Sequence, residues 1–315
     1  MNLNRFFLLA LFALTSSFAN AAAPMVKTSA PGYYRMMLGE FEITALSDGT
    51  RALPMDKLLD HITPANYTKA LNKFHLTNPI ETSFNAFLIN TGSKLVLVDT
   101  GAGSNFGPTL GKLATNLKAA GYLPEQIDEI YITHMHGDHI GGLTAEGVAQ
   151  FPNAVVRADK QEAAYWLSQE NMDKAPEAGK GSFKAAMSAL QPYVNAGHFS
   201  TFDGSSDLVP GVKAVAAHGH TAGHTTYLVE SRGQKLILWG DLMHVAAVQF
   251  DDPSVTIHFD SDSKAAYAER KQAYAQAAKE GYLIGAAHLS FPALGYLRQQ
   301  GKAYAWVPVN YSPLP

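Results

Sequence analysis

The sequence of 315 residues contains no cysteine. This absence excludes a cysteine nucleophile, a thiolate metal ligand, an iron–sulfur cluster and any disulfide. A metal ion bound by this chain must therefore be held by nitrogen and oxygen atoms.

The sequence also lacks an excess of positive charge. It has 24 lysine and arginine residues against 27 aspartate and glutamate residues, a formal net charge of −3, and no basic run. Proteins that bind nucleic acid normally show a basic excess or a basic stripe. We therefore expect no nucleic-acid partner.

After the N-terminal segment, the sequence has no long apolar run. No later stretch approaches the ~18 consecutive apolar residues that a membrane-spanning helix needs. Phe6 to Leu14 is a shorter apolar run, preceded by Arg5 and followed by the small residues of Ala19-Asn20-Ala21. This order is typical of a secretory signal peptide, which we predict in residues 1–23. We expect an exported protein, periplasmic or secreted, with no membrane association after cleavage; a buried N-terminal helix is the alternative.

Residues 24–315 are predicted to form a single α/β domain, because no linker or internal repeat interrupts them. The predicted strands are Phe41–Leu46, Ser83–Ile89, Leu95–Val98, Glu129–Thr133, Ala154–Arg157, Val212–Ala216, Thr225–Glu230 and Lys235–Leu238. The predicted helices are Leu110–Ala120, Lys160–Gln169, Phe183–Gln191 and Ser263–Lys279, the last with Ser263 as N-cap and Gly281 past its end. This order favours mixed sheets flanked by helices over a parallel barrel. Two polar stretches, Met55–Leu76 and Glu170–Gly181, are either lids over a site or surface loops.

The strongest motif follows the apolar segment Ile130–Ile132. Its metal-capable side chains are His134, His136, Asp138 and His139. Residues two apart in an extended segment point the same way, so the first two histidines can share an ion. Gly137 then lets the chain turn and present the Asp–His pair to a second ion. A surface loop that is simply rich in histidine and aspartate is the alternative.

Three further candidates each follow a predicted buried strand: His220, Asp241 and His288. Side chains at the ends of neighbouring strands can meet, so these residues can complete a site for two metal ions. Imidazole and carboxylate ligands suit zinc, while manganese, iron and cobalt stay open.

The HxHxDH motif with its three downstream partners resembles the metallo-β-lactamase superfamily over nearly all of the mature chain. The resemblance implies an α/β fold, a four-layered αβ/βα sandwich. It implies that His134, His136 and His220 bind one metal, that Asp138, His139 and His288 bind a second, and that Asp241 bridges them. It also implies that Asp99 orients a ligand histidine, and we interpret His224 as a supporting group of the same kind.

Two cations bridged by Asp241 would lower the pKa of a shared water towards neutrality and produce a hydroxide nucleophile. The same cations would stabilise the negative charge that grows on the substrate. We predict Asp241 and Asp138 as the catalytic carboxylates. Whether Asp241 or a metal-bound water passes the proton onward stays open.

Four further blocks resemble the branch that contains methyl parathion hydrolase and lactonase-like enzymes: Ala30–Met36, Thr44–Thr50, Val248–Ser254 and Pro308–Tyr311. This branch implies a homodimer and the hydrolysis of lactones, aryl esters or phosphotriesters in an aromatic pocket. The candidate pocket residues are Phe106, His244, Ile257, His258 and Phe259. Ordinary packing beyond the metal loop is the alternative for all five.

The dedicated organophosphate hydrolases of this branch carry smaller or apolar groups where His244 and Phe259 stand. These two side chains would narrow the pocket, which favours a flat lactone or aryl ester with a phosphotriester as a side substrate. A primary organophosphate hydrolase is the alternative. A cysteine-dependent β-lactamase, a glyoxalase-type thioesterase and an RNA nuclease fit less well. From another class, a non-catalytic metal-binding protein stays open.

Overall fold

The computed structural model describes residues 23–314. The predicted signal peptide, residues 1–23, lies outside the described residues except for Ala23. Pro31–Pro315 form one compact unit, and the fold given below is that of this unit. In the described part of the chain, no helix is both long and apolar enough to cross a membrane.

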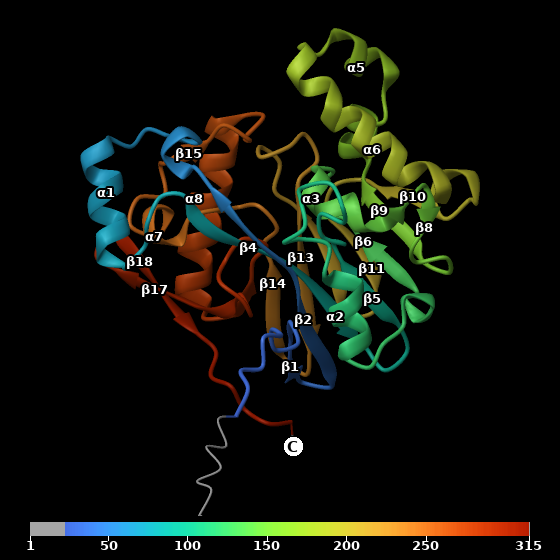
Figure 1. Cartoon of the computed structure of the whole chain (residues 1–315), viewed down its shortest axis with the longest axis horizontal. Coiled ribbons are helices and arrows are strands. Elements are labelled where there is room, and N and C mark those ends of the chain that lie inside the picture. Colours follow the sequence, from blue (N-terminus) through green and yellow to red (C-terminus); the bar gives the residue numbers. More distant parts are fainter. Residues whose placement is uncertain (1–22, 315) are drawn as a thin grey trace, which may run out of the picture. The chain divides into compact units, whose positions relative to one another are not determined.

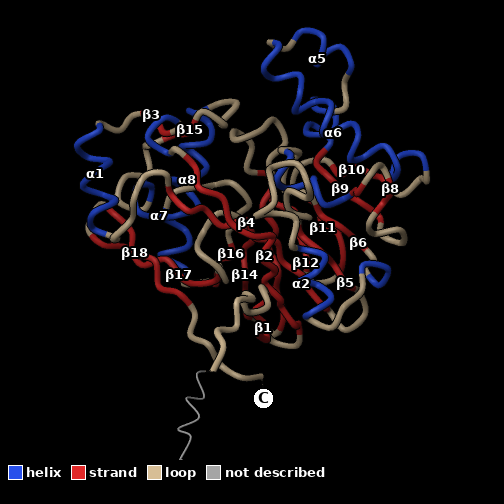
Figure 2. Tube along the Cα trace, in the orientation of Figure 1, coloured by secondary structure: helices blue, strands red, loops and turns tan. Residues whose placement is uncertain are grey.

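Two seven-stranded sheets form the centre of this unit (Figures 1 and 2). The first contains, in spatial order, β1 (Tyr33–Leu38), β2 (Phe41–Leu53), β4 (Ile80–Asn90), β5 (Leu95–Val98), β6 (Glu129–Tyr131), β9 (Val155–Asp159) and β10 (Phe199–Phe202). The second contains β11 (Ser206–Val209), β12 (Val212–Ala216), β13 (Thr225–Ser231), β14 (Gln234–Leu238), β16 (Leu283–Gly285), β17 (Leu294–Gln300) and β18 (Ala303–Pro308). Two small pairs join β3 (Leu59–Asp60) to β15 (Thr256–Ile257) and β7 (Thr144–Ala145) to β8 (Val148–Ala149).

Helices cover the outer faces of both sheets (Figure 1). The α-helices are α1 (Pro64–Lys73), α2 (Leu113–Ala119), α3 (Gly137–Ile140), α4 (Lys160–Trp166), α5 (Gln169–Lys174), α6 (Glu177–Asn195), α7 (Ala246–Gln249) and α8 (Ser263–Glu280). Short 3-10 turns are η1 (Met55–Lys57), η2 (Pro124–Gln126) and η3 (Gly141–Leu143). The helices α2, α4 and α6 pack on the first sheet, and α8 packs on the second.

Alternation along the strands of the first sheet separates the two halves of the core. Phe87, Val96 and Val98 belong to the cluster that the two sheets share. Their neighbours Leu88 and Leu97 face the other way and pack in the cluster that contains residues of α2 and α6. Successive side chains of a strand point to opposite faces, so one strand supplies both layers. The predicted four-layered αβ/βα sandwich is confirmed.

The strand β2 runs to Leu53, seven residues past the end that the sequence predicts. A bulge between Ser47 and Gly49 interrupts its pairing with β4, and Gly49 has a φ of 123° that favours glycine. The bulge breaks the alternation that defines a strand in the sequence. The register with β4 resumes beyond it, so the strand continues.

The two stretches predicted as lids or loops both contain helices. Met55–Leu76 includes α1, whose N-cap Thr63 accepts a hydrogen bond from the amide of Asn66. Glu170–Gly181 includes α5 and the first turn of α6.

The strands β1, β17 and β18 lie outside the predicted set. At the start of α8, Asp262 and not Ser263 is the N-cap, because its carboxylate accepts from two amides of the first turn.

Candidate metal centre

The histidine-rich motif leaves the end of β6 and enters α3 at Gly137. Its loop packs closely against the segment that follows β5. A Cβ built on Gly141 would lie 2.1 Å from the carbonyl oxygen of Ala102, and one on Gly142 would lie 2.0 Å from that of Thr100. Only glycine permits this approach, so the two glycines hold the loop against its neighbour.

Three histidines that the sequence separates by up to 86 positions meet at one point. His134 Nε2 lies 3.0 Å from His136 Nδ1, and His220 Nε2 lies 3.2 Å and 3.1 Å from these same two atoms. Nitrogen atoms bound to one tetrahedral zinc ion lie ~3.3 Å apart, given zinc–nitrogen bonds of ~2.05 Å. The three imidazoles are therefore spaced as ligands of a single cation.

Asp241 lies between this group and a second one formed by Asp138, His139 and His288. Its Oδ2 lies 3.3 Å from His220 Nε2, while its Oδ1 lies 3.3 Å from His139 Nε2 and 3.2 Å from His288 Nε2. Asp138 Oδ2 lies 3.6 Å and 3.5 Å from the same two nitrogens. One oxygen of Asp241 thus faces each group, as in a bridging carboxylate.

Two atoms of this centre are buried without a hydrogen-bond partner among residues 23–314: His139 Nε2 and Asp241 Oδ1. Unpaired buried polar atoms are rare and need an explanation. Both atoms point to the space that the second group encloses. The donor set, five imidazoles and two carboxylates, therefore fits two divalent cations of the zinc type.

Asp99 accepts a hydrogen bond of 2.8 Å from His139 Nδ1. The amide and the hydroxyl of Thr133 donate to its two oxygens at 2.8 Å and 2.7 Å. The carboxylate is thus fixed from one side and holds the imidazole from the other, which directs His139 Nε2 to the centre. This geometry agrees with the expectation that Asp99 orients a ligand histidine.

Asp260 has the same relation to His220, and the sequence analysis missed it. His220 Nδ1 donates to Asp260 Oδ1 at 2.8 Å, and Arg270 Nη2 lies 3.7 Å from Asp260 Oδ2, with all three side chains buried. A signal for it exists in α8, where Ala266, Arg270 and Tyr274 are spaced by four and form a buried stripe. An arginine on a buried stripe needs a buried anion nearby.

Glu162 is a second buried carboxylate that the sequence analysis missed. It accepts hydrogen bonds from the amide of Met135 at 2.7 Å, from Thr221 Oγ1 at 2.7 Å and from the amide of Gly223 at 2.8 Å. It therefore joins the loop of the first motif to the loop that bears His220. A glutamate in the first turn of a helix is common on surfaces, so the sequence holds no signal for this role.

Both ring nitrogens of His224, which we predicted as a supporting group, bind backbone atoms, so neither is free to hold a cation. Its Nδ1 donates to the carbonyl oxygen of Ala217 at 3.1 Å, and its Nε2 accepts from the amide of Asp241 at 3.0 Å. Burial, and then the charge of His220, lower the pKa of His224 to about 3, so the ring stays neutral. The ring thereby positions the backbone of Asp241.

Burial and neighbouring charges shift the pKa values of the candidate ligands in different directions. Burial and neighbouring histidines lower the pKa of His134 and His136 well below the ordinary value. Burial alone would lower the pKa of His220 as well, but Asp241 and Asp260 outweigh it and raise that pKa to about 9. For Asp241, the surrounding histidines outweigh burial and hold the pKa well below its usual range. Divalent cations would replace the protons that this arrangement attracts, so metal binding should release protons.

A cavity of about 260 Å³ opens above the centre. Its floor contains His136, Asp138, Asp241, His244 and His288, and its walls contain Arg51, Leu53, Met55, Thr82, Phe84, Phe106, Ser182 and Phe259. His244 Nε2 lies 3.1 Å from Asp241 Oδ2, and the ring of His244 stacks on that of His288 at 5.3 Å. Three of the five predicted pocket residues thus line the cavity: Phe106, His244 and Phe259.

The other two predicted pocket residues lie elsewhere, which corrects their assignment. Ile257 is fully buried in β15 and packs in a separate apolar cluster with Met55 and Val255. His258 is exposed, and its Nε2 lies 3.0 Å from Asp60 Oδ1. The strand β15 ends at Ile257 and the chain turns at His258 and Phe259, so proximity to Phe259 in the sequence did not place the other two side chains in the cavity.

A family model described as the metallo-beta-lactamase superfamily matches residues 82–281, which include six of the seven candidate ligands, all but His288. The chain belongs to the metallo-beta-lactamase superfamily. The finer prediction, the methyl parathion hydrolase branch of this superfamily, stays a prediction.

Two solved structures of the superfamily fold are similar over most of the chain. A hydrolase of the beta-lactamase superfamily called AbOPH is 37% identical with a TM-score of 0.87, over 91% of this chain and 100% of its own. AidC, a dizinc quorum-quenching lactonase, is 26% identical with a TM-score of 0.83, over 90% of this chain and 99% of its own. Among curated proteins, an N-acyl homoserine lactonase of Bacillus cereus is 27% identical over 48% of this chain and 52% of its own length. The chain thus spans about half the length of that relative.

Proposed function

We propose that this chain is a metal-dependent hydrolase that uses two divalent cations, zinc in the first place, on lactones and aryl esters. The observation that carries the proposal is Asp241, which offers one oxygen to each of two histidine groups at the floor of a cavity. The similarity to a dizinc lactonase supports the same metal and the same class of substrate.

When bound, the two cations would supply a hydroxide nucleophile near neutral pH and stabilise the negative charge that develops on the substrate oxygen. The protein's own part is to hold this centre rigidly. Asp99 and Asp260 fix two of the imidazoles, and His224 fixes the backbone of Asp241. We assign Asp138 and Asp241, the carboxylates of the floor, to take the proton that the attacking water loses and return it to the leaving group.

The walls of the cavity favour a flat substrate. Phe84, Phe106 and Phe259 are three aromatic rings of its lining, and the ring of Phe259 lies 6.1 Å from that of His244. Aromatic rings stack on planar groups such as a coumarin-type lactone or an aryl ester. A tetrahedral phosphotriester would have to fit between the same rings, so we assign phosphotriesters to a weaker side reaction.

The test compares substrates on one preparation of the purified protein, stripped with a chelator and reloaded with zinc, manganese or cobalt. We expect turnover of dihydrocoumarin, p-nitrophenyl esters and an N-acyl homoserine lactone that the chelator abolishes and metal restores. Asp241→Asn should lower the rate by roughly a thousandfold or more, since it removes the bridge. The exposed Asp251→Asn should leave it unchanged.

Two results would contradict the proposal. Tight binding of two metal ions without chelator-sensitive turnover of any ester, lactone or phosphotriester would indicate a non-catalytic metal-binding protein. A higher kcat/KM for methyl parathion than for dihydrocoumarin would instead reverse the substrate preference and make the chain an organophosphate hydrolase.

A further inference from the structure

One wall of the cavity carries a cation that has no counter-ion. Arg51 is exposed on β2, and within the described residues no carboxylate lies at ion-pair distance from it. Its guanidinium lies 5.7 Å from the centre of the Phe106 ring. Asp138 and Asp241 are the only carboxylates of the cavity lining, and both belong to the metal centre.

The pairing of β2 with β4 places this cation on the wall. Arg51 lies opposite Thr82, and Gly49 lies opposite Phe84. Because strand side chains alternate, Arg51 and Leu53 share a face with Thr82 and Phe84, and all four line the cavity.

The same register gives the position of Arg51 along the sheet relative to the metal centre. The ring of Phe84 meets that of His288 edge-on at 4.9 Å, and His288 Nδ1 donates to the carbonyl oxygen of Ser83 at 3.0 Å. Phe84 therefore marks the level of the metal centre. Arg51 pairs with Thr82, which lies two positions before Phe84 on β4. This is a displacement of ~7 Å at ~3.4 Å per residue. The backbone of Arg51 thus lies ~7 Å further along the sheet than that of Phe84, and the reach of its side chain decides which length of acyl group would bring an anion to it.

The surroundings of Arg51 define what would fit there. Leu53, Met55 and Phe84 line the same wall and are apolar. The guanidinium lies over the ring of Phe106, and a guanidinium can bind a carboxylate with two parallel hydrogen bonds. The wall therefore suits an apolar spacer that ends in an anion.

We propose that Arg51 forms an anion-binding subsite, and that the preferred substrates are esters or lactones whose acyl part ends in a carboxylate. This inference rests on the proposed hydrolase function and specifies its substrate class. Arg51 acts there as a specificity residue, since it lies away from the reacting bond.

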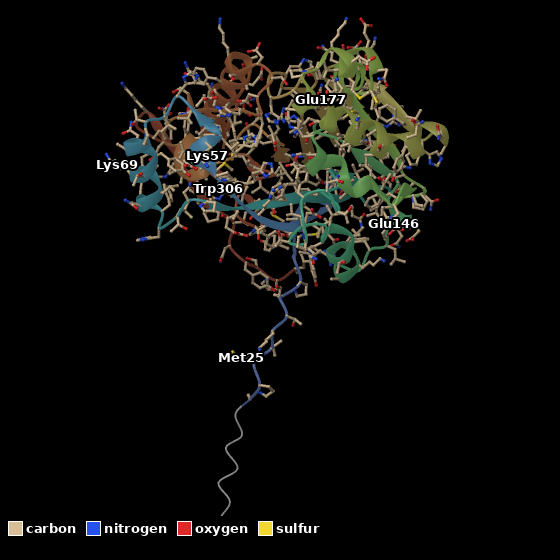
Figure 3. The ribbon with its side chains drawn as sticks, turned by 45° about the horizontal axis from the view of Figure 1, so that its top comes forward. Met25, Lys57, Lys69, Glu146, Glu177 and Trp306 are labelled. Atoms are coloured by element: carbon tan, nitrogen blue, oxygen red, sulfur yellow. The ribbon has the colours of Figure 1, made fainter. Side chains whose placement is uncertain are left out.

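The test uses mono-p-nitrophenyl esters of adipic, pimelic and suberic acid, with the methyl-capped diesters as neutral partners of equal length. Arg51→Gln should lower kcat/KM for the acids by roughly five- to twentyfold, the range of a charge-assisted pair at a partly exposed site, and leave the neutral esters unchanged. Arg51→Lys should retain part of the preference, because lysine keeps the charge but not the fork. Added salt should weaken the preference of the wild-type enzyme. Lys69→Gln is the control, since Lys69 lies on the outer side of α1 (Figure 3).

A second measurement separates failure of the subsite from failure of the proposed function. The mono-anilide of adipic acid resists hydrolysis, so its binding to the metal-loaded protein can be measured by calorimetry. Weaker binding to Arg51→Gln than to wild type supports the subsite even if no ester turns over. Equal binding to both proteins, or equal losses for acids and neutral esters, overturns it. Absence of all ester turnover refutes the proposed function alone.

Discussion

Replacing Asp260 by asparagine should weaken metal binding, although Asp260 is not one of the candidate ligands. Its buried carboxylate accepts the hydrogen bond from His220 Nδ1 at 2.8 Å, which keeps the lone pair of Nε2 directed at the centre. Loss of such a partner typically costs about 10- to 100-fold in metal affinity. An asparagine amide can also turn its NH₂ group towards the ring and favour the wrong tautomer of His220.

The magnitude divides into two parts that can be measured separately. In the metal-loaded protein, a 10- to 100-fold weaker Kd removes ~1.4–2.7 kcal/mol from the metal's contribution to the free energy of unfolding. In the metal-free protein, Arg270 loses its nearby anion but keeps hydrogen bonds to the carbonyl oxygens of Leu242, Pro253 and Val255. We therefore expect the free energy of unfolding of the metal-free protein to fall by ~1–3 kcal/mol, which is less than the loss of a fully broken buried ion pair.

The assay is a zinc titration against a coloured chelator, combined with denaturant unfolding of the metal-free and metal-loaded forms. Asp251→Asn is the matched control, because Asp251 pairs with Lys73 at 2.8 Å on the surface and such pairs contribute ~0–1 kcal/mol. An unchanged zinc affinity in Asp260→Asn would refute the orienting role. If only the metal-free stability fell, Asp260 would serve Arg270 alone.

Four further predictions concern the pocket, the backbone, the N-terminus and assembly. Phe259→Ala should raise kcat/KM for methyl parathion relative to dihydrocoumarin by roughly tenfold, since it widens the cavity; an unchanged ratio would show that the ring does not select the substrate. Gly142→Ala should destabilise the fold by about 3 kcal/mol or more, because its Cβ would lie 2.0 Å from a backbone carbonyl, as denaturant unfolding will show. Gly181→Ala in α6 has open space and should instead stabilise by roughly 0.5–1 kcal/mol, so similar effects of both changes would disprove the close packing. We propose that residues 1–23 direct export, so N-terminal sequencing of protein recovered from the periplasm should start near Pro24, and an uncleaved cytoplasmic product would contradict this. We also propose a homodimer, and light scattering at the mass of a single chain across micromolar concentrations would exclude it.

The convergence of the candidate ligands could be predicted because its signals are local. His134, His136, Asp138 and His139 stand in one short loop, so their spacing alone shows that they can converge. The three distant partners His220, Asp241 and His288 each follow a strand of one sheet, and the apolar character of those strands is visible in the sequence.

The residues behind the ligands could not be predicted in the same way. Glu162 is a single carboxylate in the first turn of a helix, and nothing in its neighbourhood distinguishes it from an exposed acid. Asp260 has only an indirect signal, the arginine on the buried stripe of α8, which indicates a buried anion but does not say which carboxylate supplies it. The edge strand β18 was missed for a related reason. Its side chains are partly exposed on both faces, so it shows no alternation to detect.

The shape of the cavity depends on strand register, which the sequence determines least directly. Arg51 and Leu53 belong to the part of β2 that follows the bulge at Gly49, beyond the end of the predicted strand. A shift of the bulge by one residue would turn both side chains to the other face and remove the cation from the wall, while the metal-binding loop would be untouched. Members of this superfamily can therefore share one centre and differ in substrate, and in this chain we expect the β2–β4 register, more than the ligands, to decide which acyl groups are hydrolysed.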